Sequence, residues 1–134
     1  NIMERQFQCP YCFGDLYLNE RIFFSAQKQD GTRGIILLTP DLGDYRAIKH
    51  PSFKVKAGEH LDFFCPLCHA NLTVEKNNKK FTLVTMIDMG DEFEVLFSQI
   101  AGEHCTYVIG EKYFKAFGED ADQNINFWGA TPNY

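Results

Sequence analysis

The sequence predicts a mainly β protein of antiparallel strands that carries a four-cysteine metal site. Two observations support this prediction. The pattern C-P-x-C occurs twice, within residues 7–18 and 63–76, and the two copies share Phe, Cys, Pro, Cys and Leu at positions shifted by 56. Around these copies, short aromatic and β-branched runs alternate with Gly, Asn, Asp and Pro, the pattern of strands joined by turns.

Four strands are expected between the first cysteine pair and the second. They cover 16–26, 34–39, 53–56 and 60–64. Asp30-Gly31 is a turn signal between the first two runs, and residues 39–44 are typical of a loop. Phe53 and Val55 alternate with lysines, which predicts a half-buried strand.

Four more strands are expected after the second cysteine pair. They cover 72–75, 81–87, 93–98 and 104–109, with turns at Asn77-Asn78 and Gly90-Asp91. Residues 112–123 fit a helix and a last short strand about equally well, and 128–134 are expected to be a loop. Ala-Gly-Glu-His occurs at 57–60 and again at 101–104, and we interpret both copies as glycine turns that enter strands rather than as a paired histidine site.

The length of 134 residues fits one domain, and no linker or low-complexity segment divides it. We therefore predict a single β-rich domain over 1–134. In this domain the cysteine segments lie at 7–18 and 63–76, the strands of 19–62 are inserted between them, and hairpins fill 81–134.

Cys9, Cys12, Cys65 and Cys68 are the predicted metal ligands. Four thiolates fill the tetrahedral shell of one structural Zn²⁺ per chain, and two C-x-x-C pairs in matching contexts favour this over a single isolated pair. Iron in the same four-thiolate site is the less favoured metal. Four free thiols, or a disulfide within each pair, are the alternatives without metal.

The paired C-P-x-C segments resemble the knuckles of the zinc-ribbon and rubredoxin-like families over residues 7–18 and 63–76. The resemblance implies that the same four cysteines bind the metal. Two features depart from it. Those families often place Gly directly after the second cysteine, where this chain has Phe13 and His69. Common zinc ribbons also separate the pairs by about 15–20 residues, whereas 52 residues lie between Cys12 and Cys65 here.

Cys105 is the fifth cysteine, and we expect it to be a core residue without chemistry. In the predicted strand 104–109 it shares one face with Tyr107 and Ile109, and this more apolar face is expected to point inward. An odd cysteine count with two close pairs favours metal binding in a reducing compartment over a disulfide framework.

The net charge and the motif content of the chain narrow the range of possible functions. Thirteen Lys and Arg against 18 Asp and Glu give a net charge of −5, which disfavours nucleic-acid and acidic-membrane binding. The sequence shows no membrane span, secretory signal or catalytic motif. We therefore expect a small cytoplasmic, non-enzymatic zinc protein that binds a protein partner. The alternatives are a rubredoxin-like iron electron carrier or thiol-redox protein, and a nucleic-acid-associated zinc ribbon.

Overall fold

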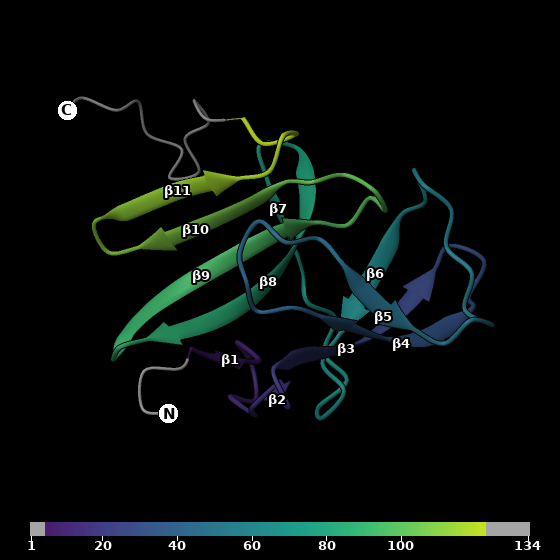
Figure 1. Ribbon diagram of the computed structural model, residues 1–134, viewed down its shortest axis with the longest axis horizontal. Coiled ribbons are helices and arrows are strands. Elements are labelled where there is room, and N and C mark those ends of the chain that lie inside the picture. Colours follow the sequence, from purple (N-terminus) through teal and green to yellow (C-terminus); the bar gives the residue numbers. More distant parts are fainter. Residues whose placement is uncertain (1–4, 123–134) are drawn as a thin grey trace.

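Antiparallel strands make up the regular structure of residues 5–122, the part of the chain that the computed structural model describes, and no helix occurs among these residues (Figure 1). The strands are β1 (Gln6–Gln8), β2 (Tyr17–Leu18), β3 (Arg21–Lys28), β4 (Arg33–Leu38), β5 (Ala47–Lys49), β6 (Leu61–Phe64), β7 (Thr73–Lys76), β8 (Lys79–Asp88), β9 (Asp91–Ser98), β10 (Thr106–Gly110) and β11 (Tyr113–Phe117). The predicted all-β, antiparallel class is thereby confirmed. The expected loop at 128–134 lies outside the described residues.

The strands form two sheets that lie side by side in Figure 1. The six-stranded sheet has the order β1-β8-β9-β10-β11, with β7 also paired to β8. The five-stranded sheet has the order β2-β3-β4-β5, with β6 also paired to β3. β1 lies in the six-stranded sheet and directly precedes Cys9, whereas β6 lies in the five-stranded sheet and directly precedes Cys65. Each of these short strands is therefore paired with strands from the other half of the chain.

The two halves of the chain repeat one arrangement. In each half a short strand leads into a C-P-x-C bend, and an antiparallel meander follows: β2 to β5 in the first half, β7 to β10 in the second. The short strands are exchanged, because β1 pairs with β8 and β6 pairs with β3. Burial follows the same repeat: β3 buries Ile22, Phe24 and Ala26 on one face, and β8 buries alternate residues in the same way. The sequence repeat at the cysteines is thus the visible part of a longer structural repeat.

Among the described residues, two-residue turns with positive φ close three hairpins, at Asn19-Glu20, Asn77-Asn78 and Met89-Gly90. Asn77 and Asn78 have φ of 53° and 62°, as a type I′ turn requires, and the turn predicted there is confirmed. Asn19 and Glu20 have φ of 51° and 61° and join β2 to β3. The prediction of one strand over 16–26 was therefore wrong, because a glutamate in this conformation gives no turn signal.

Both faces of the six-stranded sheet carry buried side chains. One face packs on the five-stranded sheet in a core where Phe24, Phe63 and Phe97 meet edge to face, with ring centroids 5.2–5.6 Å apart. The other face carries a second apolar cluster that includes Cys105 and Tyr107. The prediction that only one face of 104–109 points inward was therefore incomplete, because both faces of β10 are covered.

Three further local predictions differ from the structure. Residues 53–56 form no strand. A turn over residues 50–53, which contains Pro51 and in which the Phe53 N–H donates to the His50 carbonyl, leads into them instead. Phe53 is nevertheless buried, with its ring against Gly34. The short edge strand β5 (Ala47–Lys49) was not predicted. Of the two alternatives for 112–123, the structure has the strand, β11.

The two Ala-Gly-Glu-His segments lie against each other and connect the sheets. The Gly58 N–H donates to the Ala101 carbonyl, and the Ala101 N–H donates to the Glu59 carbonyl, both at 2.8 Å. Gly58 and Gly102 have φ of 92° and 86°, which favours glycine, so the predicted glycine turns are confirmed.

The described residues contain no helix that could cross a lipid bilayer.

Candidate metal centre

The four cysteines of the two C-P-x-C bends meet at one point. Their Sγ atoms all lie within 4.8 Å of one another, and the Cys9–Cys68 and Cys12–Cys65 sulfurs are each 3.8 Å apart. Four sulfurs at 2.3 Å from one ion in a tetrahedron would lie about 3.8 Å apart. All five cysteines are free, so no disulfide competes for these sulfurs. The donor set and its dimensions therefore fit one tetrahedral metal ion.

Matching backbone hydrogen bonds shape the two bends, which we call knuckle 1 (residues 9–14) and knuckle 2 (residues 65–70). In knuckle 1 the Cys9 N–H donates to the Gly14 carbonyl at 3.0 Å, and the Phe13 N–H donates to the Cys9 carbonyl at 2.9 Å. The corresponding bonds of knuckle 2 join Cys65 with Ala70 and with His69 at the same distances. The structure therefore extends the sequence repeat to the backbone geometry of the site.

Backbone N–H groups point at the sulfurs. The Tyr11 and Cys12 N–H groups lie 3.3 and 3.4 Å from the Cys9 sulfur, and the Leu67 and Cys68 N–H groups lie at the same distances from the Cys65 sulfur. Such donors partly compensate the negative charge of a thiolate. The bends are thus suited to holding thiolates in spite of the acidic chain.

The site has a buried side and a side toward the surface. Cys9 and Cys65 are fully buried, and burial raises the pKa of both thiols, that of Cys65 to about 12. Cys12 and Cys68 lie at the surface, and the Ala70 N–H lowers the pKa of Cys68. Since a metal must displace protons from the buried thiols, the apparent metal affinity should rise with pH.

The structure leaves the other candidate ligands outside this cluster. His69 follows Cys68 directly but is exposed and not part of the group of converging sulfurs. Cys105 is buried in the second apolar cluster with Phe81 and Tyr107, in a different part of the core from Cys9 and Cys65. The four cysteines that the sequence singled out are therefore the ones that come together.

No family model, curated protein or solved structure matches this chain. One other feature of the molecule, an apolar cavity between the sheets, has no signal in the sequence, because its walls are mostly strand residues that any β core would contain.

Glycine in place of Phe13 should stabilise the fold of knuckle 1. Phe13 and His69 have φ of 62° and 68°, although neither is glycine. Left-handed backbone costs an L-residue about 1–2 kcal/mol, and glycine's extra chain entropy offsets about 0.5–1 kcal/mol of the gain. Phe13 is 71% exposed, so little packing is lost. Phe13→Gly should therefore raise the free energy of unfolding by up to about 1 kcal/mol in urea titrations.

Tyr11→Gly is the matched control for this change. Tyr11 is also an exposed aromatic residue of knuckle 1, but its φ is not positive. Glycine there should lower the free energy of unfolding by about 0.5–1 kcal/mol. If both variants changed stability in the same direction, backbone strain at Phe13 would be the wrong explanation.

Cys105 should be chemically inert in the folded protein. Its side chain is 2% exposed, and burial raises the pKa of its thiol, so less thiolate is present at any given pH than in an exposed cysteine. In the metal-loaded protein at pH 7, a thiol reagent should modify Cys105 only as fast as the protein unfolds. Cys105→Ala should keep full metal content and cost about 1 kcal/mol. Exposed Cys12 in metal-free protein serves as the positive control, and equally rapid labelling of Cys105 would contradict its structural role.

Proposed function

We propose that the chain binds one structural Zn²⁺ through Cys9, Cys12, Cys65 and Cys68. The observation that carries the proposal is the convergence of these sulfurs within 4.8 Å, at spacings that suit a tetrahedral ion. Four-cysteine sites with a closed shell are typical of structural zinc, the metal that we propose here. The site would join the two halves of the chain where their exchanged strands, β1 and β6, end.

A structural role follows from the filled shell. Four thiolates leave no open position for a water molecule or substrate, and catalytic zinc needs such a position. We therefore propose that the protein is not an enzyme. The thiols must also stay reduced, which favours a reducing compartment such as the cytoplasm.

The knuckles support a relationship to zinc ribbons at the level of the metal site. In this proposal 7–18 and 63–76 are zinc-ribbon-type knuckles within a single domain, and the strands of 19–62 form a long insertion. The paired hydrogen-bonding pattern of the two knuckles supports this interpretation. The positive φ of Phe13 and His69, in the place where glycine is usual, is the point of difference.

Elemental analysis of the full chain as purified tests the metal proposal. We expect one zinc per chain and a colourless protein, with all four ligand thiols protected from alkylation until a chelator is added. Iron with visible absorbance would instead favour the rubredoxin-like electron carrier, to which the surface position of Cys12 and Cys68 would also be suited. Absence of metal together with a disulfide in each C-x-x-C pair would refute both.

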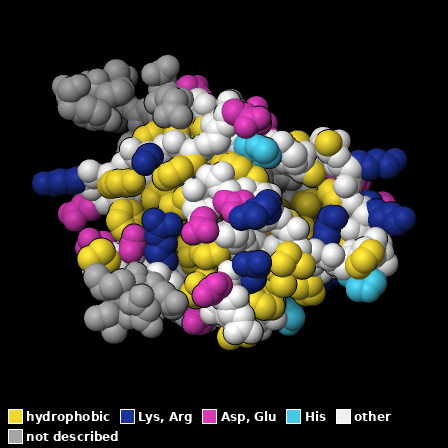
Figure 2. All heavy atoms as spheres, in the orientation of Figure 1, with side chains coloured by type: hydrophobic (Ala, Val, Ile, Leu, Met, Phe, Trp, Pro, Cys, Tyr) yellow, Lys and Arg dark blue, Asp and Glu magenta, His cyan; other side chains and the backbone are white. Residues whose placement is uncertain are grey.

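A protein partner is the proposed target of the surface around the metal. Tyr11, Phe13 and Leu67 are 52%, 71% and 58% exposed at the ends of the knuckles, and we call them the knuckle-tip patch. Large exposed apolar side chains that lie together are typical of interaction sites. Basic side chains are spread over the face in Figure 2, several beside acidic ones, and the chain is acidic overall, which argues against nucleic acid.

A comparison of two variants tests the partner. The triple variant Tyr11→Ser, Phe13→Ser, Leu67→Ser should keep its metal but lose most of a complex recovered from the cell extract of its source. The control variant Ile35→Ser, Ile48→Ser removes residues of similar exposure on β4 and β5 and should keep the complex. Equal recovery with both variants would exclude the knuckle-tip patch, and a complex that forms through nucleic acid should disappear after nuclease treatment.

A further inference from the structure

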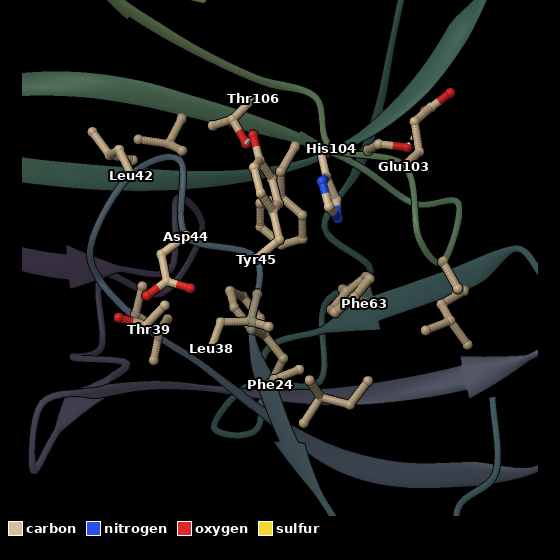
Figure 3. A pocket seen from close by; sticks show the side chains of 18 of the residues that line it. Phe24, Leu38, Thr39, Leu42, Asp44, Tyr45, Phe63, Glu103, His104 and Thr106 are labelled. Atoms are coloured by element: carbon tan, nitrogen blue, oxygen red, sulfur yellow. Dashed lines mark hydrogen bonds between the residues drawn. The ribbon is translucent and has the colours of Figure 1, made fainter. Parts of the chain in front are cut away.

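An apolar cavity of about 370 Å³ lies between the two sheets. Its walls come from both sheets: Phe24 and Leu38 from the five-stranded sheet, Phe63 from β6, and Val84 and Val95 from β8 and β9. No cysteine is among its lining residues. Figure 3 shows Phe24, Leu38 and Phe63 gathered on one side of this space. The cavity is therefore a feature of the inter-sheet core and separate from the metal centre.

Tyr45 holds the loop between β4 and β5, which lines the cavity, against the six-stranded sheet. The Tyr45 hydroxyl donates to the Phe117 carbonyl at 3.1 Å and accepts from the Thr106 hydroxyl at 2.9 Å. Its ring stacks on His104 with centroids 4.4 Å apart and an interplanar angle of 4° (Figure 3). This loop therefore links strands β10 and β11 to the rim of the cavity, so the entrance is a defined structure.

Water fills such a space poorly. A buried water needs two to four polar partners, and large apolar cavities stay dry and accept apolar guests. Three of the polar groups at the rim already have partners: Tyr45 as above, Asp44 with Arg46, and Glu103 with Lys79. A cavity of about 150 Å³ is enough for benzene. The larger volume here suits two rings or a medium-length alkyl chain.

The rim offers an anion no excess of positive charge. Three carboxylates, Asp41, Asp44 and Glu103, line the cavity together with one lysine, Lys49. The Arg46 side chain holds the pKa of Asp44 at about 2, so this carboxylate is charged at neutral pH. Arg46 and Lys79 neutralise Asp44 and Glu103, and the remaining two charges, Asp41 and Lys49, are opposite. An entering carboxylate or phosphate would therefore lose hydration without meeting net positive charge.

We propose that the cavity is a binding site for a neutral, mainly apolar small molecule, with at most a hydroxyl group at the rim. Ligand sites are concave, mostly apolar and largely preformed, with a few polar groups at defined positions. The cavity meets each of these conditions through the sheet residues that form its wall and the Tyr45 loop that forms its rim. This function is independent of the metal proposal.

Fluorescence titration of the full, metal-loaded chain with N-phenyl-1-naphthylamine tests the proposal. We expect saturable binding of one dye per chain, displaced by decanol but not by decanoate. Val84→Phe fills the cavity from its wall, and Ala47→Phe obstructs the rim at an exposed position without altering the core. Each should weaken dye binding at least tenfold. Ile48→Phe adds the same ring beside Ala47 at a position that does not line the cavity, and should leave binding unchanged.

The outcomes separate the cavity from other surfaces. Dye that binds equally to wild type and to Ala47→Phe would be bound elsewhere, for example at the knuckle-tip patch, and would overturn the proposal. Absence of saturable binding would do the same. Displacement by decanoate as effectively as by decanol would refute the preference for neutral ligands. Melting curves and the zinc content of each variant show whether it is folded. If Val84→Phe does not fold, the result for Ala47→Phe alone tests the proposal.

Discussion

Cys65→Ser should abolish stoichiometric metal binding and lower the melting temperature by on the order of 10–20 °C. Cys65 is fully buried and belongs to the group of four converging sulfurs, so no exposed residue can replace it. A metal held from Cys9 to Cys68 closes a loop of about 60 residues, and the cross-link estimate for such a loop is about 4 kcal/mol. That is comparable with the net stability of a small domain.

Chelation of the wild-type protein should have an effect of similar size, measured by circular dichroism melting with metal content determined before and after. The control is Cys105→Ala, which removes a buried thiol outside the site and should keep both the metal and the effect of the chelator. An unchanged melting temperature after verified metal removal would mean that the two sheets carry the stability without the metal. The metal would then have another role.

Phe24→Ala should be the most destabilising single change in the apolar core, at about 3–5 kcal/mol. Phe24 is fully buried and contacts Phe63 and Phe97 edge to face, so one ring connects β3, β6 and β9. The substitution removes these contacts and enlarges a cavity that already exists there. Because the structure cannot collapse around an enlarged cavity, the cost should lie at the upper end of this range.

Urea unfolding of Phe24→Ala and of a control measures the effect. Ile35→Ala is suitable as the control because Ile35 lies on β4 in the same sheet but is 51% exposed. It should cost well under 1 kcal/mol beyond the strand propensity of the residue. A loss below about 1 kcal/mol in Phe24→Ala would contradict a core shared between the two sheets.

The cysteine site was accessible to sequence reasoning because its information is local. Each C-P-x-C bend closes on itself through hydrogen bonds between residues four or five apart, as from Cys9 to Gly14. The turn at Asn77-Asn78 was predictable for the same reason. Both turn positions need a positive φ, and asparagine tolerates a positive φ better than most residues do. Where the residue type does not match the backbone, as at Glu20, the same reasoning missed the turn.

Residues 53–56 show where local pattern fails. The alternation of Phe53 and Val55 with lysines fits a strand, but Phe53 is buried because its ring occupies the space that the missing side chain of Gly34 leaves. A Cβ at Gly34 would lie 2.4 Å from the Phe53 ring. No periodicity in the sequence contains this contact, which joins positions far apart in the chain.

By itself, the sequence determined the all-β class, the set of four thiols and most of the turns, because these depend on residues that are neighbours along the chain. Only the tertiary structure decided the exchange of β1 and β6 between the sheets, the burial of both faces of β10, and the cavity beneath the Tyr45 loop. Strand pairing over long separations is selected by the sum of many weak side-chain contacts. Such a sum has no signature in any one segment, so it emerges only when the whole chain is folded.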